Sequence, residues 1–416
     1  MSDSAAEIPR LRVQTSRLGE LKLLLPLIDP RHPLIWMRKG QGIAGVGEAL
    51  RLEFSGARRM QDACAAWKEV VASATVTDPV AVSGTGLVAF GSFAFADDSA
   101  ATSVLIVPRL LLGKRDGEYW ITRVTVEGED PALVPDPTAR PLGPEYRLSL
   151  LPGSMGPDDF RSAVQAAIDR IADQQLSKVV LARDLTGHLP EGADLRRTLT
   201  DLALGYPDCW TYSVDGFLGS SPETLVSVSR GTVTARVLAG TTSRGTDAAA
   251  DHDKAVALAT SSKDLDEHGY AVASVLSALA PHSRTLSSSE QPFTLKLPNL
   301  WHLASDVLGT LSDGSTSLDL IAALHPTAAV AGAPTASALA LIRELEPFDR
   351  GRYAGPVGWV GADGDGEWAV ALRSAQVAPD GDITAYAGCG IVADSEPERE
   401  YLETKMKFRP IVEAFG

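Results

Sequence analysis

Carboxylates at helical spacing, close to a lysine, are the residues of this chain best suited to chemistry. In "SEPEREYLETKMKF", Glu400, Glu403 and Lys407 fall on one side of a predicted helix. Ser395 and Glu398 have the spacing of a capping box at its start. Two carboxylates and an ammonium on one face can hold Mg²⁺ and a substrate carboxylate together, because Mg²⁺ prefers oxygen ligands. The plain alternative is a row of surface ion pairs.

A second carboxylate pair lies in "SSKDLDEHGY". Asp264 and Glu267 are three residues apart and therefore share a face of the helix that this stretch predicts. Its plain alternative is a solvated helix surface. Upstream of the last helix, "AGCGIVADS" forms a glycine turn whose free N–H groups could receive an anion.

One lysine and one glutamate have the types and settings of a base and an acid. Lys178 opens the apolar run "KVVLARDL", where a lysine is costly to bury unless it is used, although it could also extend to the surface. Glu223 follows a turn in "FLGSSPETLVSV" and could stay protonated as a general acid, or be an exposed turn residue. His325 in "LHPTAAVAGAP" could serve the site or be structural.

The elements that must position these residues come in blocks. "GPDDFRSAVQAAIDRI" predicts a helix that leads into the Lys178 strand, and "DHDKAVALATSSKDLDEHGYAVASVLSALA" predicts further helix. "EYWITRVTV" alternates as a strand does, and "ADGDGEW" predicts a hairpin turn between two strands. Blocks of strands with helices between them favour an α+β fold.

Composition excludes several classes of protein. The 416 residues carry 53 acidic and 38 basic side chains, a net charge of −15, which argues against nucleic acid and anionic membranes as partners. Three scattered cysteines predict neither disulfides nor structural zinc. No signal peptide or membrane span is recognisable, so a cytoplasmic protein is expected. Length and the proline-rich "VPDPTARPLGP" favour two domains that meet near residue 152.

Seven segments, in this order, resemble the chorismate-utilising enzymes: "SKVVLARDL", "FLGSSPETLVSV", "VLAGTTSRG", "SSKDLDEHGY", "LHPTAAVAGAP", "DRGRYAGPVGWV" and "YAGCGIVADSEPEREYLETKMKF". The resemblance implies an α+β fold. A single large domain, residues 1–416, would have an extensive antiparallel β-sandwich core flanked by helices. Residues 1–152 would then be one half of the sandwich, and residues 153–416 would carry the catalytic motifs.

The resemblance also separates the chemistries of this group. Lys178 stands where isochorismate and salicylate synthases carry a water-activating lysine and the aminating synthases carry glutamine. Ala239 in "VLAGT" replaces the nucleophilic lysine of aminodeoxychorismate synthase. This implies an isochorismate synthase, in which Lys178 activates the water that attacks C2 of chorismate and Glu223 protonates the departing C4 hydroxyl. A salicylate synthase, which also eliminates pyruvate, and a non-catalytic chorismate-binding relative are the alternatives.

The remaining roles follow from the same resemblance. Mg²⁺ would be held by Glu267 and Glu403, with Asp264 and Glu400 in or near its shell. The residues expected to bind substrate are Thr241, His325, Arg373, Gly388, Gly390 and Lys407. Cys389 stands where alanine is common in the family. A monomer is expected that binds chorismate, with no nucleic acid, membrane or glutaminase subunit as partner.

Overall fold

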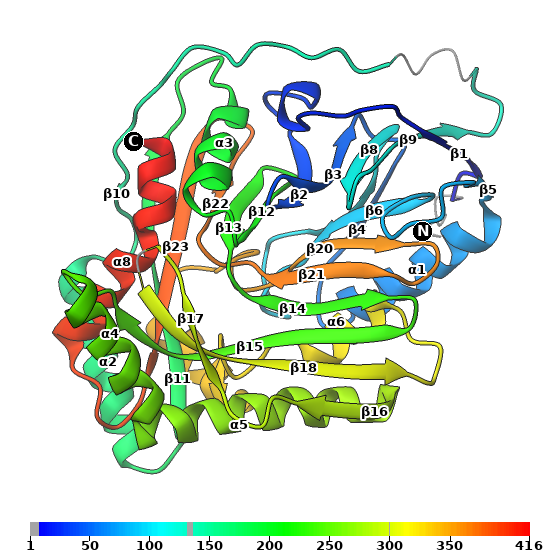
Figure 1. Ribbon diagram of the computed structural model, residues 1–416. Coiled ribbons are helices and arrows are strands. Elements are labelled where there is room, and N and C mark those ends of the chain that lie inside the picture. The colour runs from blue at the N-terminus through cyan, green and yellow to red at the C-terminus, as the bar shows by residue number, and fades with distance from the viewer. Residues whose placement is uncertain (1–7, 131–135, 299) are drawn as a thin grey trace, which may run out of the picture.

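Two large β-sheets packed face to face make up the centre of the molecule (Figure 1). The computed structural model describes residues 8–130, 136–298 and 300–416, without the side chains of Lys263 and Glu267. Neighbouring strands in both sheets run antiparallel, apart from the parallel pair β1–β5. The α+β sandwich expected from the sequence is confirmed.

In the described residues the first sheet has 13 strands, in the order β10 (Leu151–Pro152), β11 (Lys178–His188), β23 (Asp382–Ile391), β22 (Ser374–Val377), β13 (Phe217–Ser221), β12 (Trp210–Val214), β2 (Leu34–Arg38), β3 (Gln41–Val46), β8 (Leu110–Arg115), β9 (Glu118–Val126), β1 (Leu11–Arg17) and β5 (Thr75–Thr77), with β19 (Gly332–Ala333) paired to β11. The second has 10, in the order β16 (Ser283–Ser288), β18 (Leu300–Leu311), β15 (Thr232–Ser243), β14 (Thr224–Ser229), β21 (Gly366–Val370), β20 (Pro356–Gly361), β6 (Val88–Ser92), β7 (Ser103–Val107) and β4 (Leu50–Phe54), with β17 (Phe293–Lys296) paired to β18.

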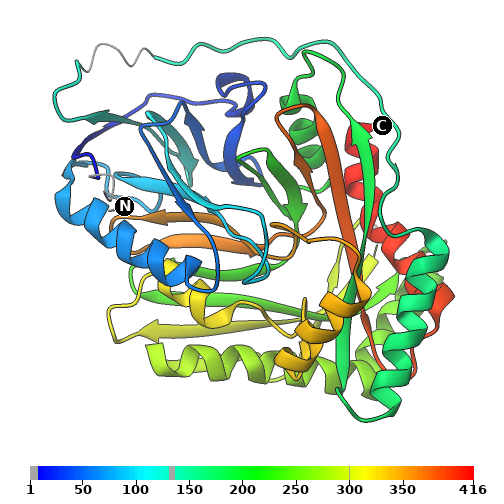
Figure 2. The ribbon, with the colours of Figure 1, turned by 180° about the vertical axis from the view of Figure 1, so that it is seen from behind.

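The helices cover the outer faces of the sheets (Figures 1 and 2). They are α1 (Arg59–Ser73), α2 (Pro157–Ala172), α3 (Leu195–Gly205), α4 (Ala248–Thr260), α5 (Ser262–Leu279), α6 (Ser317–Leu324), α7 (Thr335–Leu345), α8 (Pro397–Phe415) and the short 3₁₀ turns η1 (Leu25–Leu27) and η3 (Ala280–His282). Helices α3 and α8 pack on the first sheet, and α1, α5 and α6 on the second.

Aromatic side chains fill the space between the sheets. Trp36 and Trp120 come from the first sheet, and Phe90 and Trp359 come from the second; all four are fully buried. The carboxylate of Glu367 joins the two layers, because the indole N–H groups of Trp36 and Trp359 each donate to its Oε2 at 3.1 Å. The polar ends of these large side chains are therefore satisfied inside the core.

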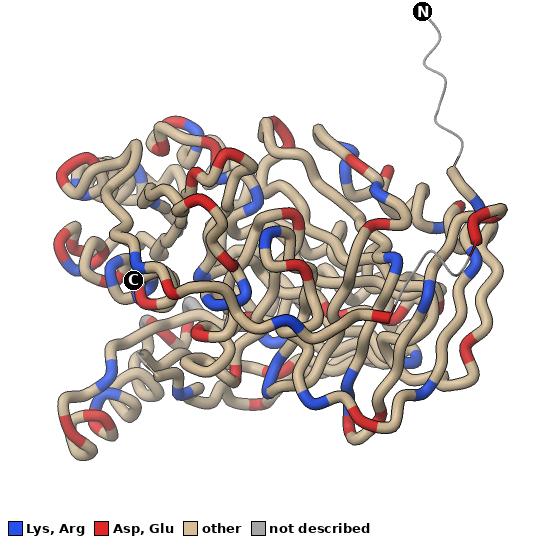
Figure 3. The backbone as a smooth tube through the Cα atoms, turned by 90° about the horizontal axis from the view of Figure 1, so that it is seen from above, with Lys and Arg blue, Asp and Glu red and all other residues tan. Residues whose placement is uncertain are grey.

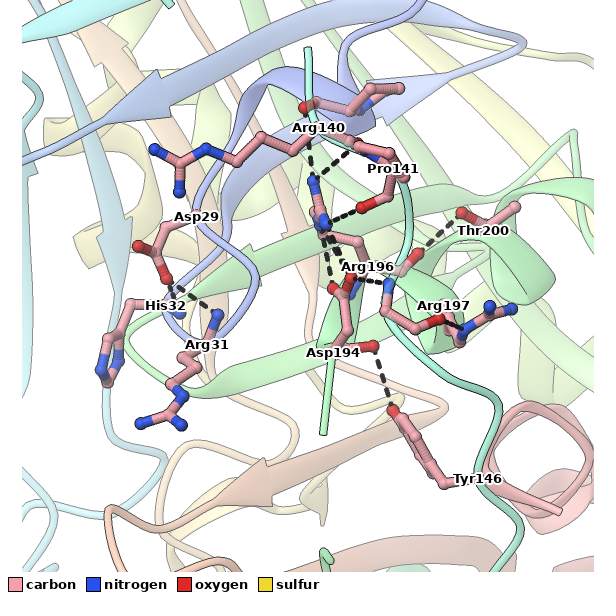
Figure 4. Close-up of polar contacts among 12 residues, drawn as sticks. Asp29, Arg31, His32, Arg140, Pro141, Tyr146, Asp194, Arg196, Arg197 and Thr200 are labelled. Atoms are coloured by element: carbon pink, nitrogen blue, oxygen red, sulfur yellow. Dashed lines mark hydrogen bonds and ion pairs between the residues drawn. The ribbon is translucent and has the colours of Figure 1, made fainter. Parts of the chain in front are cut away.

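The two parts of the chain on either side of residue 152 do not form separate sheets. Strand β2 pairs with β12 in the first sheet, and β6 pairs with β20 in the second. The boundary suggested by "VPDPTARPLGP" begins outside the described residues. From residue 136 the chain runs without helix or strand to β10. Arg196 fixes this run (Figure 4), because its guanidinium donates to the carbonyls of Arg140 at 3.3 Å and Pro141 at 2.8 Å.

Some predictions of local structure are confirmed and others are wrong. The helix expected from Pro157 and the hairpin of β20 and β21 are confirmed. The predicted cap of the last helix is wrong: α8 begins after Glu396 without a side-chain cap, and Ser395 Oγ instead accepts from the backbone N–H of Val392. The helical stretch 248–279 is divided into α4 and α5 at Ser261.

Charge is spread over the whole molecule. Figure 3 shows acidic and basic positions interspersed along the chain, so that neither sign gathers on one side in that view. Among the described residues, no helix combines the length and the apolar character that crossing a membrane requires.

Candidate active site

A pocket of about 200 Å³ lies where the ends of the two sheets meet. Strands β11 and β23 of the first sheet, β15 and β18 of the second, and helices α5 and α8 all contribute to its lining. The pocket brings together nearly all of the residues that the sequence singled out: Lys178, Glu223, Thr241, Asp264, Arg373, Gly388, Gly390, Glu400, Glu403 and Lys407.

Glu223 and Arg373 enter the pocket from two chain crossings between the sheets. Glu223 lies between β13 of the first sheet and β14 of the second, and Arg373 lies between β21 of the second and β22 of the first. The crossings hydrogen-bond to each other, because Ser220 N donates to Arg373 O and Val370 N donates to Glu223 O, both at 3.1 Å. Arg373 has a φ of 51°, an uncommon backbone conformation that often accompanies function.

Burial controls the charge of Glu223, which is 6% exposed. Burial raises its pKa to about 7, although Arg373, Lys178 and Lys407 all favour the carboxylate. The alternative of an exposed turn glutamate is therefore wrong. A carboxyl group with this pKa is available as a proton donor near neutral pH.

Strands β11 and β23 carry the base candidate and the glycines. Lys178 and Val180, two residues apart on β11, both line the pocket. On the neighbouring strand β23, Gly390 pairs with Val180 and Gly388 pairs with Ala182. The Lys407 ammonium donates to Gly388 O at 3.0 Å and is 2.6 Å from Glu403. Burial is the largest influence and opposes its charge, but Glu403 and Cys389 together outweigh burial and Arg373, so the pKa of Lys407 is raised.

Carboxylates from two helices face the same pocket. Glu400 and Glu403 come from α8 and Asp264 from the first turn of α5. Burial, and then the neighbouring Glu403, raise the pKa of Glu400, as expected for a buried carboxylate beside a second one. Glu267 lies on α5, but its side chain is outside the description. Among the side chains that are described, no three His, Cys, Asp or Glu residues form a metal-holding cluster. The oxygen donors present are of the type that Mg²⁺ prefers.

A histidine that the sequence analysis missed completes one wall. His302 on β18 pairs across the sheet with Thr241 on β15, next to a bulge at Gly240, and its Nδ1 lies 2.9 Å from Thr241 Oγ1. Its Nε2 is buried and has no hydrogen-bond partner among the described residues. Burial, then Arg373 and Lys407, keep its pKa well below the usual value. An isolated histidine in the strand "LWHLASDV" was the available signal.

His325 does not reach the pocket, contrary to its expected role in substrate binding. Its Nε2 lies 2.8 Å from the carbonyl oxygen of Phe95, and its ring meets the Phe95 ring edge-on at 5.6 Å. The structural alternative fits this histidine. Two other pocket residues, Arg350 and Tyr353, were not singled out from the sequence.

The family profile described as chorismate binding enzyme matches residues 30–416. The chain belongs to this family. It is 42% identical over 272 residues to isochorismate synthase DhbC of Bacillus subtilis, covering 62% of this chain and 68% of that protein. It is 36% identical over 263 residues to isochorismate synthase MenF of Bacillus subtilis, covering 62% and 56%. The structure of MenF, the menaquinone-specific isochorismate synthase of Escherichia coli, shares the fold with a TM-score of 0.78 at 24% identity, covering 97% and 95%.

Proposed function

We propose that this protein is an isochorismate synthase, an isomerase that converts chorismate to isochorismate. The observation that carries the proposal is the presence of Lys178 and Glu223 in one pocket, with a pKa of Glu223 near 7. A base and an acid with opposite protonation needs can act in the same cycle near neutral pH. Relatives of similar sequence bear the name isochorismate synthase.

Each residue has a defined part in this reaction. Lys178 takes a proton from the water that attacks C2 of the ring, the ring double bonds shift, and Glu223 donates its proton to the C4 hydroxyl, which leaves as water. One water enters and one leaves, so the product is an isomer. Return of a proton from Lys178 to Glu223 through solvent restores both groups. Arg373 and Lys407, beside Gly388 and Gly390, would bind the pyruvyl carboxylate, and Thr241 would line the ring site.

Mg²⁺ is the proposed cofactor. Glu403 and Glu267 would hold the ion, with Asp264 and Glu400 in or near its shell. The ion would neutralise the ring carboxylate and supply charge stabilisation in the pocket. We also propose a monomer that works in the cytoplasm. It needs no glutaminase subunit, since water and not ammonia is the nucleophile. Relatives named isochorismate synthase DhbC and isochorismate synthase MenF both match the chain.

Product analysis tests the proposal. Purified protein is incubated with chorismate and Mg²⁺, and the products are separated by chromatography. Isochorismate as the main product is expected. Salicylate with equimolar pyruvate would identify a salicylate synthase instead, and chorismate binding without turnover would identify a non-catalytic relative.

A further inference from the structure

Strand β11, which carries Lys178, has a gap along one of its edges. Strand β23 pairs with it from Val179 to His188 on the other edge. On the gapped edge, β19 covers only Lys178 and Val179, and β10 covers only Leu185 and Thr186. Backbone groups between these two short strands are buried and need other partners, because a buried unpaired N–H or C=O is costly.

A buried ion pair fills this gap. Glu346 Oε1 accepts from the backbone N–H of Ala182 at 2.8 Å, and Arg350 Nη2 donates to the carbonyl of Val180 at 2.7 Å. The two side chains bond to each other at 2.6 Å and are only 1% and 2% exposed. The pair thus supplies an acceptor and a donor of the kind that a neighbouring strand would have supplied.

Arg350 also holds a second wall of the pocket. Its Nη1 donates to the carbonyl of Val330 at 3.0 Å, and Val330, Val180 and Arg350 all line the pocket. The ring of Phe95 lies against the guanidinium at 4.6 Å. Since His325 is bonded to the Phe95 carbonyl, that histidine supports the pocket through Phe95 and Arg350.

We infer that Arg350, held by Glu346, is a positioning residue that fixes the Lys178 strand against the opposite wall of the pocket. Its planar guanidinium reaches the carbonyls of Val180 and Val330 and the Glu346 carboxylate at once. An ammonium group presents no such fork. The assignment rests on the proposed function, because Lys178 is the base of that reaction. Misplacement of a reacting group by about 1 Å can cost about 10²-fold in rate.

The test compares Arg350→Lys with a matched control. Arg350→Lys is expected to lower kcat about 10- to 100-fold, with KM for chorismate within about threefold of the wild-type value. The control is Arg196→Lys. Arg196 is also paired with a carboxylate, that of Asp194, and donates to backbone carbonyls (Figure 4). The side chains of Arg196 and Asp194 are each 3% exposed, but Arg196 does not line the pocket. The kcat of Arg196→Lys should stay within about twofold of the wild-type value. Circular dichroism and thermal melting establish that both variants are folded.

Each outcome decides the inference. A wild-type kcat for folded Arg350→Lys overturns it, and so does an equal loss of kcat in Arg196→Lys. If Arg350→Lys does not fold, Glu346→Gln is measured in the same way, since glutamine keeps an oxygen acceptor for Ala182. A fall in kcat at unchanged KM then supports the inference, and a kcat within twofold of wild type overturns it. Failure of the proposed function is distinct, because the wild-type protein would then form no isochorismate.

Discussion

At the scale of single residues, the pocket is dominated by a buried acid and the basic side chains around it. Lys178, Arg373 and Lys407 all stabilise the carboxylate form of Glu223, yet burial outweighs them and its pKa is raised to about 7. Glu223 therefore keeps its proton up to nearly neutral pH. The proposed reaction needs Glu223 as an acid there, together with Lys178 as a base. The consequences can be measured as a pH dependence and as a loss of rate.

Activity should fall as the pH rises above about 7. Glu223 must be protonated to act as an acid, so its ionisation in the free enzyme removes kcat/KM about tenfold per pH unit above its pKa of about 7. Glu223→Gln should lower kcat by about 10²- to 10⁴-fold and abolish this alkaline limb. The measurement is a pH profile of kcat/KM. Glu398→Gln, at a more exposed glutamate on α8, is the control and should keep the wild-type profile. A Glu223→Gln enzyme with wild-type kcat would show that another group delivers the proton.

Exchange of the base should change which nucleophile is used. Lys178→Gln introduces the residue that the family resemblance assigns to the aminating synthases, and it should lose isochorismate formation by at least about 10²-fold. Wild-type protein should give no aminated product even in high ammonium, whereas Lys178→Gln should give a slow aminated product. Chromatography with and without ammonium measures both, with Lys39→Gln at an exposed lysine as the control. Undiminished isochorismate from Lys178→Gln would remove Lys178 from the role of base.

At the scale of elements, one helix face carries much of the proposed anion and metal binding. Glu400, Glu403 and Lys407 lie three and four residues apart on α8 and all face the pocket. Phe408 and Ile411 on the same helix are buried against the first sheet. Burial of that apolar stripe fixes the rotation of α8 and hence the direction of its charged residues.

Loss of one carboxylate on this face should weaken Mg²⁺ binding. Glu403→Gln removes a proposed charged oxygen ligand, so the Mg²⁺ concentration for half-maximal activity should rise at least about tenfold. Calorimetric titration of Mg²⁺ gives the affinity without relying on turnover. Glu413→Gln, at an exposed residue of the same helix, is the matched control. Unchanged Mg²⁺ affinity in Glu403→Gln, or full wild-type activity in excess chelator, would contradict the metal assignment.

At the scale of the whole molecule, the two sheets join the N-terminal and C-terminal parts of the chain. Each sheet contains a block of strands from each part, joined where β2 pairs with β12 and where β6 pairs with β20, and the aromatic layer between the sheets takes side chains from both. Separation of the parts would expose that layer and leave strand edges unpaired.

Fragments 1–152 and 153–416 should therefore not fold when expressed alone. Each is expected to lack a cooperative thermal transition, whereas the full chain should melt in one main transition. Circular dichroism and calorimetry on the three proteins provide the comparison. A soluble 153–416 fragment with a cooperative melt would instead support the two-domain organisation that length and the proline-rich segment suggested.

Local patterns in the sequence were sufficient for several elements. The helix of Phe160 and the strand of Trp120 follow from periodicity, because neighbours along the chain determine which side chains share a face. The spacing of Glu400, Glu403 and Lys407 likewise predicted a common side. The order of the seven motifs predicted the family and its fold.

Only the tertiary structure decided where those faces meet. Lys178 and Glu223 share a pocket because strands from two sheets end at one place, and the Arg350–Val180 bond joins residues 170 positions apart. Local periodicity carries no information on such pairings. For the same reason, the sequence misjudged His325, which packs on Phe95, and overlooked His302, whose role depends on its cross-strand neighbour Thr241. Side-chain type is encoded locally, but burial and partners come from distant strands, and these determine the chemistry of each group.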